Sequence, residues 1–248
     1  MKTNPPNDEP VQIRLLAYFV PNRDKLPPSL KFLNKVVGTL GFPFVLIPRC
    51  DHRLHMMSIE QASNIHHLVD RILATDVPGD FVELGCYAGS SAALISGLLE
   101  QLGAQREFHV YDRFDIEFGK QQNIREVFRN TIHAAGVPMP IIHEGDFLQT
   151  VPMQLPELIA FAHVDCGTGG SAEEHAQLIT HCLEGLYPRL AQGAVLLLMD
   201  YHRAGSTLDG YGELPGVQVA CDAFFLDKPE HIQLLYGGPY SHAFVRKR

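Results

Sequence analysis

The chain has 248 residues, 46% of them hydrophobic and 19% charged, which is enough apolar material for a large core and excludes a disordered chain. Its 28 acidic against 20 basic residues give a net charge of −8, which disfavours nucleic acid as a partner. Five scattered cysteines without Cys-x-x-Cys spacing argue against a zinc site or a disulfide framework. Since no apolar run is long enough to cross a membrane and the first ten residues are unlike a signal peptide, we expect a cytoplasmic protein.

Prolines interrupt the first 55 residues so often that no regular element is predicted there, although residues 11–20 fit a short strand or helix. We therefore interpret residues 1–55 as an N-terminal arm or lid. Residues 56–248 are interpreted as the main domain, because their sequence becomes regular.

From residue 58 onward, helix-like and strand-like segments alternate. Ser58 and Gln61 form a capping box, and apolar residues at helical spacing then predict a helix that ends before Pro78. Strands are predicted at 80–84, 107–111, 140–143, 159–164, 194–199, 232–235 and 243–245, and further helices near Ser90, Asn123, Ser171 and Val217. Short apolar strands separated by helices predict a doubly wound α/β fold, with a mostly parallel seven-stranded sheet.

Acidic residues mark the carboxyl ends of five predicted strands. In open α/β sheets, ligands bind beyond these ends. Glu83 lies in the first strand, and the later strand ends carry Asp112, Asp146, Asp165 and Asp200. An acidic edge attracts cationic ligands and accepts hydrogen bonds from hydroxyls and amines.

The loop after the first strand discriminates between cofactors. A dinucleotide fingerprint that starts at Gly85 needs glycines where Tyr87 and Ser90 stand, and Tyr87 would obstruct a pyrophosphate. An oxidoreductase is therefore disfavoured. The spacing Glu83-x-Gly85-x-x-x-Gly89 suits a ligand without phosphates: Gly85 permits a tight turn, and Gly89 lets the next helix start close to the strand.

This pattern indicates S-adenosylmethionine, which combines a cationic sulfonium with ribose hydroxyls and an adenine amine. We expect Asp112 to accept both ribose hydroxyls and Glu83 to lie under the amino acid part. Asp146 would accept from the adenine amine, while Phe147 or Phe114 packs on the ring. The loop residues Gly85, Tyr87, Gly89 and Ser90 complete the expected cofactor site. For the acids at the strand ends, a purely structural role in a turn or a pairing stays open.

The chain resembles the macrocin O-methyltransferase family in these acids and in two runs, Val77-Pro78-Gly79-Asp80-Phe81-Val82-Glu83-Leu84-Gly85 and Met199-Asp200-Tyr201-His202. The resemblance covers about residues 56–226. It implies a Rossmann-like class I methyltransferase that uses S-adenosylmethionine to methylate sugar hydroxyls in antibiotic biosynthesis. It also implies a divalent metal, usually magnesium, held by an acid after the fourth strand and an acidic pair after the fifth.

Asp165 and Asp200 match two of the three metal ligands that the resemblance implies. Met199 stands where the family has the first acid of the pair, and a thioether is a poor ligand for a hard cation. Two carboxylates with a sugar diol and waters still suffice for magnesium, since that ion needs few protein ligands. We therefore expect weak metal dependence or none.

The methyl acceptor must lose a proton, so the site needs a base. His202, two residues after Asp200, is our candidate, because histidine titrates near neutral pH. A loop histidine without a catalytic role fits the sequence nearly as well. His163 points to the same strand face as Asp165, but a histidine on a buried strand is more often a core residue.

The sequence thus predicts a methyltransferase that acts on a hydroxyl of a small molecule, in first place a sugar moiety of a secondary metabolite. A catechol-like phenol as acceptor, and a non-catalytic relative that only binds the cofactor, are the alternatives. We expect a homo-oligomer that has neither nucleic acid nor a membrane as partner.

Overall fold

A computed structural model describes residues 28–42, 57–115, 123–166, 170–207, 215–237 and 241–248. The chain divides into two compact units, Met1–His55 and Met56–Arg248. In the first unit the described element is helix α2 (Pro28–Thr39), which the sequence analysis did not predict. Proline is tolerated in the first turn of a helix, so Pro28 begins this element and does not interrupt one. The segment 11–20 lies outside the described residues.

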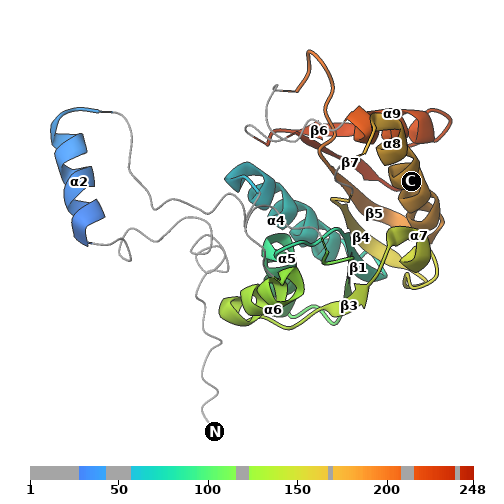
Figure 1. Ribbon diagram of the computed structural model, residues 1–248, viewed down its shortest axis with the longest axis horizontal. Coiled ribbons are helices and arrows are strands. Elements are labelled where there is room, and N and C mark those ends of the chain that lie inside the picture. Colours follow the sequence, from blue (N-terminus) through green and yellow to red (C-terminus); the bar gives the residue numbers. More distant parts are fainter. Residues whose placement is uncertain (1–27, 43–56, 116–122, 167–169, 208–214, 238–240) are drawn as a thin grey trace, which may run out of the picture. The chain divides into compact units, whose positions relative to one another are not determined.

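The second unit is built on a seven-stranded sheet of order β3-β2-β1-β4-β5-β7-β6, shown in Figure 1. Its strands are β1 (Asp80–Leu84), β2 (Phe108–Asp112), β3 (Ile141–Glu144), β4 (Ile159–Val164), β5 (Leu190–Met199), β6 (Gln233–Leu235) and β7 (His242–Arg246). Only β7 runs antiparallel to its neighbours β5 and β6. The doubly wound, mostly parallel seven-stranded sheet expected from the sequence is therefore confirmed.

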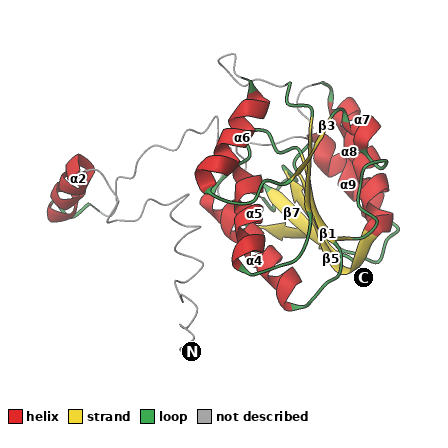
Figure 2. Ribbon diagram, turned by 90° about the horizontal axis from the view of Figure 1, so that it is seen from below, coloured by secondary structure: helices red, strands yellow, loops and turns green. Residues whose placement is uncertain are grey.

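Helices cover both faces of this sheet, as Figure 2 shows. One face carries α4 (Ile59–Ala74), α5 (Ser90–Gln101) and α6 (Ile124–Ala135), and the other carries α7 (Phe147–Thr150), α8 (Ala172–Leu186) and α9 (Pro215–Phe225). A 3₁₀ turn, η2 (Tyr187–Arg189), leads into β5. Within the described residues, no helix has both the length and the apolar character that a membrane span requires.

Local signals explain where the main helices begin. Ser58 and Ser171 each accept a hydrogen bond from the third helical residue, and the side chains of Gln61 and Glu174 return to the cap, which makes both capping boxes complete. Asn123 caps α6 in the same way. These helix starts agree with the sequence analysis.

The largest difference in a predicted strand concerns β5, which begins at Leu190, four residues before the predicted start at 194. Its register against β4 shifts between Ile159 and Phe161, and Gly193 adopts φ +86°. This irregularity separates residues 190–193 from the apolar run that follows them. The sequence pattern therefore missed the first four residues of the strand. Helix α7 was also missed, because four residues show no helical period.

Candidate active site

Four acidic residues lie at one edge of the sheet. The strands β2, β1, β4 and β5 are neighbours and run parallel, so their carboxyl ends meet and bring together Glu83, Asp112, Asp165 and Asp200. Surrounding protein and the charges of Glu83 and Asp112 raise the pKa of Asp165 to about 6, although the residue is exposed and His163 opposes the shift. Burial and the charge of Asp165 raise the pKa of Asp200 well above its usual value. The edge thus concentrates negative charge and favours a cationic ligand.

The loop after β1 passes directly against the chain that follows β4. Gly85 adopts φ +84°, and a Cβ atom there would stand 1.9 Å from the backbone oxygen of Asp165. Adjacent backbone bonds fix this approach: the Gly85 amide donates to Tyr111, and the Asp165 amide donates to Leu84. No side chain fits at position 85, so the glycine is required by both the turn and the close contact.

The carboxylate of Asp112 holds the same loop from the β2 side. Its Oδ2 accepts hydrogen bonds from the amides of Cys86 and Tyr87, at 2.9 and 2.8 Å, and its Oδ1 accepts from the amide of Phe114 at 2.7 Å. A carboxylate has about four acceptor positions. One remains on Oδ1, so acceptance of both ribose hydroxyls by Asp112 would require it to give up a backbone bond.

Strained backbone gathers at this edge. Among the described residues, four that are not glycine have positive φ, and three of them lie here: Tyr87 at 40°, Phe114 at 55° and Asp200 at 57°. The Asp112 carboxylate binds the amides of two of these residues. Such conformations persist where the surrounding structure holds them, and they cluster at functional sites.

Gly89 and Ser90 begin helix α5. Gly89 is its N-cap with φ +86°, and an added Cβ would lie 2.8 Å from the ring of Phe128 in α6. The close approach that needs this glycine is therefore to the neighbouring helix, and not to the strand as the sequence analysis expected. Ser90 is buried, while Tyr87 is half-buried in the loop.

Asp146 caps the short helix α7. Its Oδ1 accepts from the amide of Leu148 at 2.9 Å, and its Oδ2 lies 3.5 Å from a guanidinium nitrogen of Arg113. Phe147, the first residue of α7, is buried, and so is Phe114, whose ring packs edge-on against Phe128. A structural role, as the cap of α7 and the partner of Arg113, thus accounts for these contacts of Asp146. A role for Asp146 and Phe147 at the adenine stays a prediction.

Glu83 is fully buried in β1, and its expected place under the amino acid part of the cofactor stays a prediction. Its Oε1 lies 2.7 Å from Nδ1 of His163, and its Oε2 makes no hydrogen bond among the described residues. Burial lowers the pKa of His163, but the hydrogen bond and charge of Glu83 outweigh burial and raise it. Glu83 and His163 are paired residues of β1 and β4, just before the loop and Asp165 that follow these strands. His163 is fully buried, so it is the core histidine that the sequence favoured.

The segment after β5 carries the candidate base. Nδ1 of His202 lies 2.6 Å from the hydroxyl of Thr207, and the half-buried ring also approaches Ser241. Tyr201 is buried, donates to Asp222 and accepts from Arg203. Burial and the contact with Asp222 raise its pKa to about 12, although Arg203 opposes the shift. Sequence reasoning missed these polar partners, of which Asp222 and Ser241 are 21 and 39 residues away in the chain.

A magnesium ion at this edge would find two carboxylates, those of Asp165 and Asp200. Burial and neighbouring carboxylates raise the pKa values of both groups, and a cation bound between them would oppose that shift. Met199 is buried, so its position offers neither an oxygen nor an open ligand site. The donor set therefore fits an ion shared with substrate oxygens and water.

We predict that Gly85→Ala lowers the free energy of unfolding by about 3 kcal/mol or more, because backbone atoms must separate. Gly103→Ala is the control: it also has positive φ, 65°, but nothing lies within 4 Å of an added Cβ, so it costs only about 1 kcal/mol. Urea denaturation measures both. Equal losses in the two variants would refute the close approach at Gly85.

Residues 82–201 match the protein family described as a methyltransferase domain. No match was found among curated proteins. The structure is similar to the O-methyltransferase NovP (TM-score 0.60, 19% identity, 88% of this chain and 98% of that one) and to CalS11, a TDP-rhamnose 3′-O-methyltransferase of calicheamicin biosynthesis (0.57, 18%, 99% and 96%). It also resembles PaMTH1 of Podospora anserina, solved with S-adenosylhomocysteine (0.56, 17%, 100% and 100%). The fold of this chain is the Rossmann-like fold of class I methyltransferases.

Proposed function

We propose that this protein is an S-adenosylmethionine-dependent O-methyltransferase that acts on a small hydroxylated molecule. The acceptor that we propose is a sugar. One observation carries the proposal: the glycine loop after β1 lies among the strand-end acids Asp112, Asp165 and Asp200, at the edge where class I methyltransferase folds bind ligands. The negative charge there complements a sulfonium.

The residues of the loop bind and orient the cofactor. Asp112 keeps the loop backbone in place through Cys86 and Tyr87 and has one acceptor position for a ribose hydroxyl. The buried Glu83–His163 pair supports the floor. When bound, S-adenosylmethionine supplies an electrophilic methyl group. Because positioning of the acceptor oxygen in line with that group supplies much of the rate, a rigid floor serves the reaction directly.

Removal of the acceptor proton falls to His202. The acceptor oxygen forms the new C–O bond, the C–S bond breaks toward sulfur, and the hydroxyl proton passes to the imidazole. Thr207 orients that ring through Nδ1. Asp165 and Asp200 would hold a magnesium ion together with acceptor oxygens, or would accept hydrogen bonds from the acceptor directly.

The resemblance to the macrocin O-methyltransferases and the similarity to CalS11 favour a sugar as acceptor and a role in secondary metabolism. Two other outcomes are tested beside it. A catechol-like phenol suits the same acidic edge, and Met199 favours a relative that binds the cofactor without turnover. Assays with a panel of sugars, nucleotide sugars and phenols distinguish the three: turnover of phenols alone, or of no acceptor, contradicts the proposed sugar acceptor.

We predict that Asp112→Ala weakens binding of S-adenosylmethionine by roughly 100-fold or more, because two loop amides lose a charged acceptor. Isothermal titration calorimetry with S-adenosylmethionine and S-adenosylhomocysteine measures the change. Asp227→Asn, which alters an exposed acid after α9, is the control and leaves affinity unchanged. Near-native affinity of the Asp112 variant would show that this residue does not contribute to cofactor binding. Failure of the wild-type protein to bind either compound would contradict the proposed function.

We predict that His202→Gln lowers kcat by roughly 10²- to 10⁴-fold, the usual contribution of a general base, and leaves cofactor affinity unchanged. His133→Gln on the exposed side of α6 is the matched control and keeps the wild-type rate. Steady-state kinetics with the best acceptor of the panel provide the measurement. An unaltered kcat in His202→Gln would assign proton removal to another group.

We predict that a chelator lowers the rate by less than about tenfold, since the two carboxylates at this edge hold magnesium only weakly without the third acid that Met199 replaces. The assay compares chelated enzyme with the same enzyme after added magnesium. Complete loss of turnover that magnesium restores would show instead that two protein carboxylates suffice for an essential ion.

A further inference from the structure

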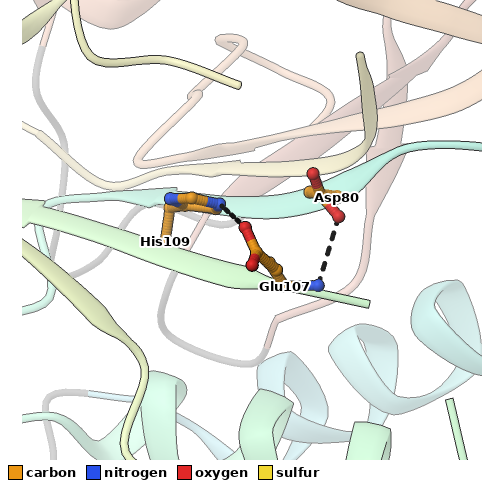
Figure 3. Close-up of side chains that lie close together, drawn as sticks. All are labelled: Asp80, Glu107 and His109. Atoms are coloured by element: carbon orange, nitrogen blue, oxygen red, sulfur yellow. Dashed lines mark hydrogen bonds and ion pairs between the residues drawn. The ribbon is translucent and has the colours of Figure 1, made fainter. Parts of the chain in front are cut away.

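Three side chains of metal-binding type meet at the opposite edge of the sheet, at the amino ends of β1 and β2. They are Asp80, Glu107 and His109, which Figure 3 shows side by side. One ligand atom from each lies within 4.8 Å of the others. Val82 pairs with His109 across the two strands, and the Asp80 carboxylate accepts the amide of Glu107 at 3.1 Å. Glu107 and His109 are two residues apart and so share one face.

A series of hydrogen bonds sets which ring nitrogen of a neutral His109 carries its proton. The amide oxygen of Gln154 accepts from Nδ1 of His143 at 3.0 Å, so Nδ1 of that ring carries the proton. Nε2 of the neutral His143 ring then accepts from Nδ1 of His109, also at 3.0 Å. Tyr111 stacks on His143 at 4.3 Å and donates to the Gln154 backbone, which holds this series in place.

In this series of hydrogen bonds, a neutral His109 has its proton on Nδ1 and therefore a lone pair on Nε2. This residue is only 8% exposed, and its buried Nε2 makes no hydrogen bond within the described residues. Oε2 of Glu107 lies 3.4 Å away. A nitrogen lone pair that faces a carboxylate oxygen is repulsive, and a positive species between them removes the repulsion. The one basic side chain next to the cluster in sequence, Arg106, binds Asp76 and the Val77 carbonyl.

We propose that Asp80, Glu107 and His109 form a binding site for a divalent transition metal of the zinc type, which clamps the first residues of β1 and β2. One imidazole nitrogen and two carboxylates are ligands that zinc accepts, whereas calcium and magnesium select oxygen ligands. Two carboxylates balance the charge of the ion. A ligating histidine usually donates its other ring N–H to an outer partner, and His143 is that partner here.

The site is separate from the methyl-transfer edge. Asp80 begins β1 and Leu84 ends it, so about 13 Å of strand lie between the two edges. The clamp therefore acts on the pairing of β1 with β2 and takes no part in the transfer. Its test does not depend on the proposed function, because it needs no cofactor and no acceptor.

Calorimetric titration of the chelator-treated full chain with zinc chloride provides the test. We expect one saturable equivalent, weakened at least about 100-fold in His109→Gln and unchanged in His133→Gln. The visible absorption of bound cobalt(II) reports whether an imidazole ligand is present, and zinc raises the Tm of the wild-type protein but not of His109→Gln.

A second pair of variants keeps the test valid if His109→Gln fails to fold. The Glu107 side chain is 67% exposed, so Glu107→Gln leaves the core intact and weakens zinc binding about tenfold, whereas Glu126→Gln on α6 leaves it unchanged. Absence of a saturable equivalent, or an equivalent that persists in His109→Gln and disappears in Asp165→Asn, overturns the proposal. Absence of a saturable equivalent would mean that His109 and Glu107 form an ion pair and leave no place for a metal ion.

Discussion

The whole candidate site depends on one backbone contact, the approach of Gly85 to the carbonyl of Asp165. It joins the loop after β1 to the chain after β4, and it leaves no space for a side chain at position 85. Everything else at this edge is arranged around it: Asp112 holds the loop from the β2 side, and the Glu83–His163 pair fills the space below.

The electrostatic consequence of that arrangement is an excess of negative charge. The charge of Glu83 is matched by His163, and that of Asp112 is spread over three backbone amides, so these two carboxylates are already stabilised. Within the described residues, Asp165 and Asp200 have no comparable side-chain partners, and their pKa values are raised. The folded protein therefore keeps two carboxylates in a state that a cationic ligand or ion would stabilise, while the other two build the floor.

Sequence reasoning succeeded where the signal is local and failed where it is not. Strands 80–84 and 159–164 and the helix starts at Ser58 and Ser171 follow from apolar runs and caps, which act within a few residues. The Glu83–His163 contact joins residues 80 positions apart, and the three backbone amides that Asp112 binds give this expected ligand group a structural role that the sequence did not show. The sequence shows that an acid stands at each of these two strand ends. Which groups each acid binds is decided by tertiary packing, which the sequence pattern does not show.

The two edges of the sheet are linked through the pairing of β1 with β2. These strands pair from Phe81 and Phe108 to Leu84 and Tyr111, and their register decides where the Asp112 carboxylate meets the loop. A shift by one residue would turn every side chain of β2 to the other face. An ion at the amino edge would hold this register at its start, so that the carboxyl edge receives Asp112 in the place that its three backbone bonds require.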